Sequence, residues 1–331
     1  MEGRRGRRGR RGRRGSCLIA FSALSAFSAL SSPVHAQTIH VTGRVLNADS
    51  SAVAGVRVVL HRVGQSQQGP LDSTRSDREG RFRFSYAPDA ASFYLTSARY
   101  AGIEYFSAPL PTNPGAPRAP ISLMVYDTSS RAPVEMEARH LVLTRPVEDG
   151  SRSVLDLIIV RNGGRVTRVA PDTTSGSWSV PLPRGTTGLQ VRESDVSSEA
   201  LRRSGDSLII AAALAPGEKQ LTLEYQVPPG RTSIELPLNR AGLPLNVLVE
   251  EPAVRVTAPG IAPADSQLIQ NRSFRRWTGT VTSAGMLRLM LPGKQSGPPW
   301  LLAALVGGLA IALVAGGWYA IRSRPLLRRA V

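Results

Sequence analysis

Alternation of apolar and polar residues with a period of two is the clearest pattern between residues 38 and 110. Residues 39–46 alternate in this way, and residues 81–86 do so strictly, with their aromatic side chains on one side. Such alternation is typical of β-strands that bury one face. Strands are also expected at residues 56–60, 92–98 and 103–107, and no helical period interrupts the region. We therefore predict a small β domain over residues 37–108.

A tight hairpin is predicted around Asp77. The Asp77 carboxylate can accept backbone N–H groups within the turn, and Gly80 can adopt the positive φ that closes it. Phe82 and Phe84, two residues apart on the following strand, would then point into one core.

Three segments of this domain resemble the carboxypeptidase regulatory-like domain. They are residues 41–45, 53–60 and 76–84, which match a G-x-V pattern, a glycine-led apolar strand and a T-D-x-x-G-x-F hairpin. Ser76 stands where that family more often has Thr. The resemblance covers about 70 of 331 residues and implies a seven-stranded, transthyretin-like sandwich related to starch-binding-like folds. In that family the domain accompanies catalytic or transport modules and is not itself catalytic, and some members are assigned carbohydrate binding.

Five prolines within residues 109–120 predict a stiff linker and a domain boundary. The following residues are again rich in short apolar segments, and Asn162-Gly163 is a strong hairpin signal. A Pro-Pro-Gly break at residues 228–230 predicts a β-sandwich over 121–229 and a smaller β domain over 230–293. One larger continuous domain is the alternative. The expected fold class is mainly β, with serial β-sandwich domains and one C-terminal transmembrane α-helix.

The beginning of the chain predicts export. Residues 1–16 carry eight Arg, and an apolar run over residues 17–30 follows them. Ala36 offers a small residue for cleavage, so residues 1–36 are predicted to be a signal peptide. An uncleaved N-terminal anchor is the alternative.

The end of the chain predicts a membrane anchor. Residues 300–321 carry no charge and would form roughly 33 Å of helix at about 1.5 Å per residue, enough to cross a bilayer. Gly308, Ala312 and Gly316 share one face of this helix and are candidates for packing against another helix. Four arginines in residues 322–331 predict a cytoplasmic tail. We therefore expect a type I single-pass protein that contacts membrane lipid and lies mostly outside the cytoplasm.

The net charge of +17 reflects the predicted membrane topology more than it indicates the kind of binding partner. Much of it lies in residues 1–16 and in the basic tail. The intervening chain has no Lys/Arg cluster interleaved with aromatic residues, so nucleic-acid binding is not expected. Cys17 is the only cysteine and falls in the predicted signal peptide. The mature chain therefore has no disulfide and no thiolate chemistry.

Residues with catalytic or metal-binding potential are sparse. The histidines of the mature chain, His40, His61 and His140, lack metal-ligand spacing, and no G-x-S-x-G motif is present. A Ca²⁺ loop would need more carboxylates than Asp72, Asp77 and Glu79 supply. The pairs Glu135 with Glu137 and Glu250 with Glu251 are interpreted as solvated strand residues. We expect no catalytic residue, no metal and no cofactor, and therefore no enzyme.

Aromatic residues are the remaining candidates for ligand contact. Tyr100, Tyr105 and Phe106 lie near the end of the first predicted domain and are the tentative contact residues. Trp178 and Trp277 are interpreted as core residues, with sugar stacking as the alternative. The functional hypothesis is a non-enzymatic, membrane-anchored protein of the bacterial envelope whose β domains bind a protein or carbohydrate partner. The alternative is an accessory or scaffold subunit that packs through its transmembrane helix.

Overall fold

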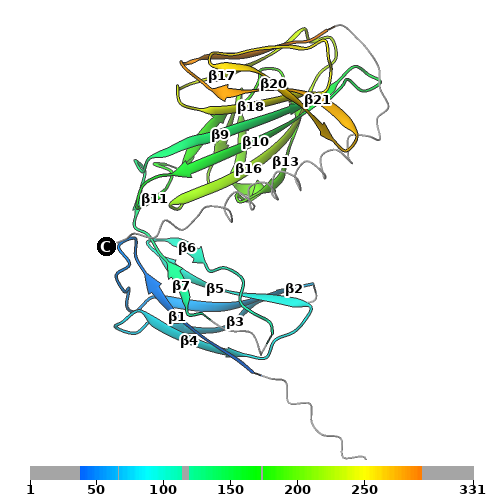
Figure 1. Ribbon diagram of the computed structural model, residues 1–331. Helices are drawn as coiled ribbons and strands as arrows, with labels where there is room; N and C mark the ends of the chain where they lie inside the picture. Colours follow the sequence, from blue (N-terminus) through cyan, green and yellow to red (C-terminus); the bar gives the residue numbers. More distant parts are fainter. Residues whose placement is uncertain (1–37, 66, 114–118, 173, 293–331) are drawn as a thin grey trace, which may run out of the picture. The chain divides into compact units, whose positions relative to one another are not determined.

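The computed structural model describes residues 38–65, 67–113, 119–172 and 174–292 (Figure 1). Over these residues the fold is mainly β, as expected, and the helical content is one three-residue turn at Ser198–Ala200. None of the helical structure in these ranges is long and apolar enough to cross a membrane. The predicted signal peptide, the predicted transmembrane helix with Gly308, Ala312 and Gly316, and the basic tail lie outside the described residues.

Within the described residues, the first domain consists of seven strands in two sheets around one core. One sheet has the order β4-β1-β7 and the other the order β3-β2-β5-β6. The strands are β1 (Ile39–Leu46), β2 (Arg57–Gly64), β3 (Gln68–Arg75), β4 (Arg81–Tyr86), β5 (Ser92–Tyr100), β6 (Ile103–Phe106) and β7 (Ile121–Met124). Side chains from both sheets meet in the core, among them Leu60, Phe84 and Tyr94. Alternation along β1 and β4 therefore buries one face of each strand, as predicted.

The turn predicted around Asp77 forms between β3 and β4, but it does not close a hairpin, because β3 pairs with β2 and β4 pairs with β1 in the other sheet. Asp77 Oδ1 accepts the backbone N–H of Glu79 at 3.0 Å and that of Arg81 at 2.7 Å. Gly80 closes the turn with a φ of +73°. The Asp77 carboxylate thus holds the backbone N–H groups of its own turn.

Phe82 and Phe84 leave this turn and enter the core, which confirms the prediction. Phe82 lies opposite Gly43 on β1 and covers it. A Cβ at Gly43 would come within 2.4 Å of the Phe82 ring and 2.8 Å of the Ile121 carbonyl oxygen. Only glycine fits at this position, because the ring occupies the space that a side chain would need.

We expect the Asp77 carboxyl to titrate below its ordinary value of 3.8. The backbone N–H and the guanidinium of Arg81 stabilise the ionised form, which lowers the pKa of Asp77. Because the pKa is lowered in the folded state, the stabilisation is fully present above the unfolded pKa and is lost as pH falls through the folded one. Carbon-13 NMR of the carboxyl groups, assigned with Asp77→Asn, measures the midpoint. A midpoint at or above 3.8 would show that the turn hydrogen bonds do not hold in solution.

The prediction of a linker and domain boundary at residues 109–120 is wrong. Strand β7, directly after this segment, pairs in parallel with β1. Leu110, Leu123 and Val125 are all buried in the first core. The segment therefore joins β6 of one sheet to β7 of the other within the first domain. The first domain extends through Val125.

The second domain is built on a seven-stranded sheet with the order β13-β16-β10-β9-β18-β21-β20. These strands are β9 (Val134–Leu143), β10 (Arg152–Asn162), β13 (Thr187–Ser194), β16 (Gly217–Val227), β18 (Pro244–Val249), β20 (Ile261–Ile269) and β21 (Arg272–Thr280). Two three-stranded sheets accompany it, β12-β15-β14 and β17-β22-β19. Their strands are β12 (Trp178–Pro181), β14 (Leu201–Ser204), β15 (Ser207–Ile210), β17 (Ser233–Leu238), β19 (Arg255–Thr257) and β22 (Gly285–Met290). The short strands β8 (Thr128–Ser129) and β11 (Thr167–Arg168) pair in parallel.

A single cluster of buried apolar residues joins the three larger sheets of the second domain. It includes Ile158 from the seven-stranded sheet, Leu208 from β15 and Leu287 from β22. The expected division near residues 228–230 is absent, because β16 and β18 on either side of it belong to the same sheet. β18 is moreover the parallel neighbour of β9. The continuous larger domain, weighed as the alternative, is the arrangement found.

A charged cluster is buried inside this core. Arg139 on β9 donates from Nε to Asp156 Oδ1 on β10 at 2.9 Å and from Nη2 to Asp156 Oδ2. Tyr225 on β16 donates its hydroxyl to Asp156 Oδ2 at 3.1 Å. The exposed fractions are 1% for Arg139 and 0% for both Asp156 and Tyr225. Burial and the neighbouring Asp156 carboxylate raise the pKa of Tyr225 well above its ordinary value, so Tyr225 remains a hydrogen-bond donor.

The interpretation of Glu250 and Glu251 as solvated residues is wrong. Both are buried, and each is paired with arginine: Glu250 with Arg272, and Glu251 with Arg152 at 3.0 Å. Carboxylates are buried in proteins when charged partners and hydrogen bonds compensate them. These two glutamates therefore stabilise the sheet end near β18 rather than face solvent.

Candidate functional site

The outer face of the sheet β3-β2-β5-β6 carries apolar side chains where a sandwich usually presents polar ones. On β2 and β5, one set of alternate residues enters the core and the other set points outward. The outward set, together with Phe106 on β6, forms a continuous surface that we call the apolar face. It comprises Val59, His61, Val63, Phe93, Leu95 and Phe106.

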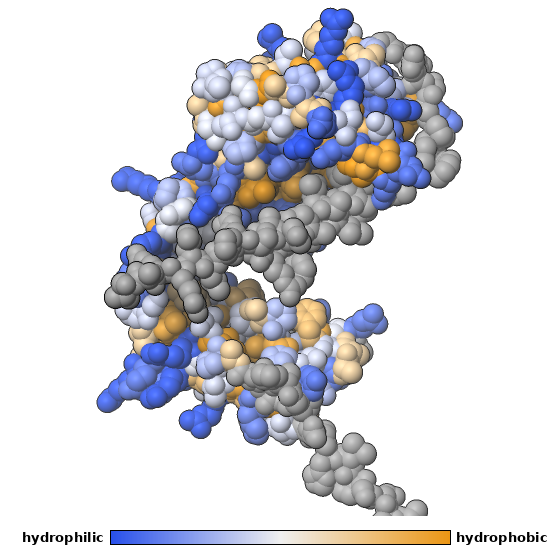
Figure 2. All heavy atoms as spheres, viewed as in Figure 1, coloured by the Kyte–Doolittle hydropathy of each residue, from blue (hydrophilic) through white to orange (hydrophobic). Residues whose placement is uncertain are grey.

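Two phenyl rings dominate the apolar face. Phe93 is 47% exposed and Phe106 is 61% exposed, which makes them two of the large apolar side chains most open to solvent in the described chain. They come from neighbouring strands of one sheet, and the His61 ring lies between their positions, 6.2 Å from the Phe106 ring. Figure 2 shows apolar residues, in orange, among hydrophilic ones on the visible side of this domain. Contiguous exposed apolar surface of this kind marks an interaction site more often than isolated apolar residues do.

A hydrogen-bonded chain of three polar residues lies in the same face. The Nε2 atom of His61 is 2.8 Å from Ser97 Oγ, and the Ser97 hydroxyl donates to Glu104. A hydrolytic triad needs the histidine between the serine and the acid. Here the serine lies between the other two and is itself fully buried. This order orients the His61 ring beside Phe106 and does not activate Ser97 as a nucleophile.

Of the three residues predicted to contact a ligand, only Phe106 lies on the apolar face. Tyr105 points into the core, is 6% exposed and donates its hydroxyl to the Tyr126 carbonyl at 2.9 Å. Burial raises the pKa of Tyr105. Tyr100 packs against the same core and donates its hydroxyl to Asp127 at 3.1 Å. The three residues therefore come from β5 and β6 but lie on opposite sides of the sheet.

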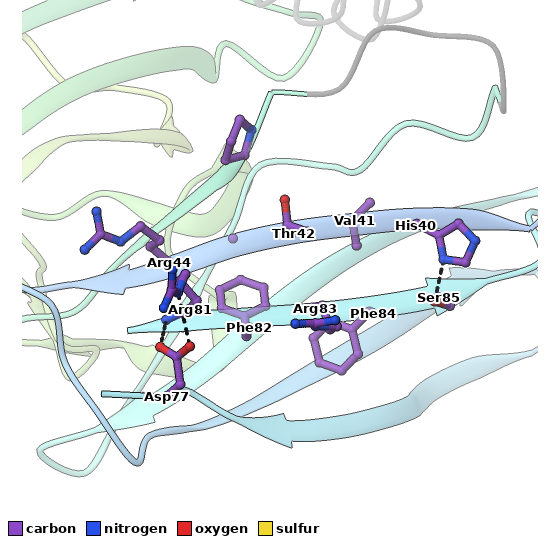
Figure 3. Close-up of a pocket in the computed structure, with 12 residues that line it drawn as sticks. His40, Val41, Thr42, Arg44, Asp77, Arg81, Phe82, Arg83, Phe84 and Ser85 are labelled. Atoms are coloured by element: carbon purple, nitrogen blue, oxygen red, sulfur yellow. Dashed lines mark hydrogen bonds and ion pairs between the residues drawn. The ribbon is translucent and has the colours of Figure 1, made fainter. Parts of the chain in front are cut away.

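A hollow of about 750 Å³ lies on the outer side of the other sheet, over β1 and β4 (Figure 3). Its lining comprises His40, Thr42, Arg44, Arg81, Arg83 and Ser85, with Asp77 at one end. His40 Nδ1 lies 2.7 Å from Ser85 Oγ, and Arg81 is paired with Asp77 at 3.1 Å. The hollow is polar and partly charge-compensated, in contrast to the apolar face on the opposite sheet.

The three histidines do not come together. His40 and His61 lie on different sheets of the first domain, and His140 lies on β9 of the second. Burial, with the nearby Arg276 guanidinium, lowers the pKa of His140, which favours its neutral form. Across the described residues no group of three or more His, Cys, Asp or Glu side chains is placed to hold a metal ion.

The two tryptophans of the second domain occupy different positions. Trp277 on β21 is buried in the core, as interpreted from the sequence. Trp178 on β12 is only partly buried and packs at the margin of the same core.

No protein-family model and no curated protein matches the chain. Solved structures with some likeness include a "putative protease" from Parabacteroides distasonis ATCC 8503, at 11% identity over 48% of this chain and 40% of that one, with a TM-score of 0.31. Another is leukotriene A4 hydrolase from Saccharomyces cerevisiae, at 10% identity over 47% of this chain and 29% of that one, with a TM-score of 0.30. The chain thus spans less than half the length of either protein. At these TM-scores the likeness carries no argument about fold or function.

Proposed function

We propose that this chain is a non-catalytic binding protein of the bacterial envelope, anchored in the membrane by residues 300–321. Its first domain would bind a partner protein through the apolar face. The observation that carries this proposal is the exposure of two phenyl rings, Phe93 and Phe106, on the outer face of one sheet, with His61 and Leu95 between their positions. The resemblance to the carboxypeptidase regulatory-like domain agrees with it, since that domain accompanies other modules without performing catalysis.

A protein fits the apolar face better than a sugar chain does. Aromatic residues are enriched in the centres of protein interfaces, where a few of them contribute most of the binding energy. The face combines two phenyl rings with three aliphatic side chains, and the polar groups of His61, Ser97 and Glu104 hydrogen-bond to one another. The partner is therefore expected to present an apolar patch of its own, with polar groups at the margin opposite Arg99 and Glu104.

We expect the variant Phe93→Ser with Phe106→Ser to lose the partner while keeping its fold. Both side chains are largely exposed, so their removal costs little stability, whereas interface aromatics typically contribute about 2 kcal/mol or more each to binding. Chains purified from membranes in mild detergent would be compared by quantitative mass spectrometry of the proteins that copurify. A drop of at least tenfold in one discrete copurifying protein is expected.

The matched control is Arg83→Ser, an exposed residue of the polar hollow on the opposite sheet. It should retain the partner at the level of the unaltered chain. Equal recovery from all three chains would contradict the proposal, and so would a copurifying glycan, in place of a protein, that depends on the two phenyl rings.

A further inference from the structure

Several connections of the second domain gather at the end from which the chain continues beyond Pro292 (Figure 1). At this end β9 finishes opposite the start of β10, β18 finishes beside β9, and β22 finishes beside the starts of β17 and β19. The turn between β20 and β21 lies there too, because Arg272 directly after it is paired with Glu250 directly after β18. We call this part of the second domain the exit end. Its connecting segments are residues 144–151, 182–186, 228–232, 250–254 and 270–271.

Two large apolar side chains are open to solvent at the exit end. Leu268 precedes the turn between β20 and β21 by two residues and is 73% exposed. Met290 is the last residue of β22 and is 50% exposed. Each comes from a strand end that lies beside the point where the chain leaves the domain.

Basic side chains surround these two residues. Arg231, Arg255 and Arg275 are exposed at the exit end, and within the described ranges none of them is in an ion pair. The exposed carboxylates in the neighbouring loop belong to Glu148 and Asp149. Other exposed arginines of this end are already paired with carboxylates: Arg145 with Glu250, and Arg184 with Asp206. The exit end therefore combines exposed apolar groups with an excess of positive charge.

Residues 293–299 separate the exit end from the predicted transmembrane helix. Seven residues reach at most about 25 Å, even when fully extended. A domain of about 165 residues has a radius of gyration of roughly 15 Å, so this tether is shorter than the domain is wide. The inference rests on the anchor proposed above. With residues 300–321 in the bilayer, the exit end is the part of the second domain that the tether holds against the lipid surface.

We propose that the exit end docks on the surface of a bilayer that contains anionic phospholipid. Leu268 and Met290 enter the headgroup layer, and Arg231, Arg255 and Arg275 lie beside the lipid phosphates. Basic residues are attracted to such a surface, and apolar side chains gain free energy by leaving water for the interface. Docking gives the second domain a defined orientation on the membrane, which a tether alone does not. It uses no residue of the apolar face, so it is independent of the protein partner proposed there.

Single labelled cysteines in the full chain test the docking. Cys17→Ser removes the native cysteine, and Leu268→Cys, Met290→Cys or Asn239→Cys then carries one nitrobenzoxadiazole fluorophore. Asn239 is the matched control, because it is exposed directly after β17 at the opposite end of the same domain. The chains are placed in nanodiscs of phosphatidylcholine and phosphatidylglycerol that include a lipid with a nitroxide quencher on its headgroup. Quenching of the labels at Leu268 and Met290 is expected to exceed that at Asn239 at least fivefold.

The role of the arginines is tested with Arg231→Ser and Arg255→Ser combined. The ratio of quenched to unquenched label at Met290 should fall about tenfold or more, since each basic residue near an anionic surface favours docking about fivefold. The control combines Arg161→Ser with Lys219→Ser, which removes the same charge where β10 ends and β16 begins, at the opposite end of the domain. It should leave the ratio unchanged.

Coelution of the chain with the nanodiscs in high salt reports the anchor separately, because salt screens the attraction between arginines and lipid. A chain that coelutes but shows equal quenching at all three positions would contradict the docking and leave the anchor intact. Equal effects of the two charge-removing variants, or undiminished quenching in nanodiscs of phosphatidylcholine alone, would contradict the role of anionic lipid. A chain that does not coelute would contradict the anchor and the docking together.

Discussion

Asp156→Ala is expected to destabilise the second domain more than any exposed substitution in the chain. The change removes the carboxylate that neutralises Arg139 and accepts the Tyr225 hydroxyl. It leaves a guanidinium in a site that is 1% exposed. Removing one partner of a buried ion pair typically costs about 3–5 kcal/mol of stability, because the other charge is left buried without compensation. For a domain of this size the melting temperature should fall by roughly 6–20 °C.

Thermal and urea unfolding of the full chain, followed by circular dichroism, measures this loss. The matched control replaces both partners, Arg139→Met with Asp156→Leu, and should recover most of the lost stability, because no charge is then buried alone. The explanation would be wrong if Asp156→Ala cost less than about 1 kcal/mol, or if the double variant were as unstable as the single one.

A fragment of residues 38–126 is expected to fold, whereas a fragment of residues 38–112 is not. The shorter fragment lacks β7 and therefore loses the parallel neighbour of β1 together with the buried Leu123 and Val125. Burying a Val or Leu side chain contributes about 1.5–3 kcal/mol, so these two account for roughly 3–6 kcal/mol. That is a large part of the total stability of a small domain, which is only about 5–15 kcal/mol.

Proton NMR dispersion and urea unfolding distinguish the two fragments. Leu123→Ala in the longer fragment should cost about 2–5 kcal/mol, because it leaves a cavity at a fully buried position. Equal folding of both fragments would contradict the assignment of β7 to the first domain. Failure of both would show that this domain does not have a sufficient core of its own.

Local patterns along the chain predicted much of the first domain. The Asp77 turn, the positive φ of Gly80 and the inward direction of Phe82 and Phe84 all follow from neighbours within a few residues, and the structure confirms them. The membership of β7 could not be predicted in this way. Its partner β1 lies some 80 residues earlier, and the proline-rich segment before it has the composition of a linker.

Charged and aromatic residues show a second limit of sequence reasoning. Glu250 and Glu251 were expected in solvent, yet each is buried beside an arginine that is distant in the chain. Residues 92–98 were expected to form a strand, but the side on which Phe93 lies follows only from its register with β2, which turns it outward. In both cases the strand can be predicted. The side of the sheet on which each side chain lies depends on strand pairings that a single sequence does not reveal.

The most direct test of the central proposal is photo-cross-linking from single positions in intact cells that carry the chain. A photoreactive amino acid replaces Phe106 on the apolar face or, as control, Arg83 on the opposite sheet. The account predicts one discrete protein adduct from position 106, lost when Phe93→Asp is added, and none from position 83. Absence of any adduct from position 106, or the same adducts from both positions, would contradict it.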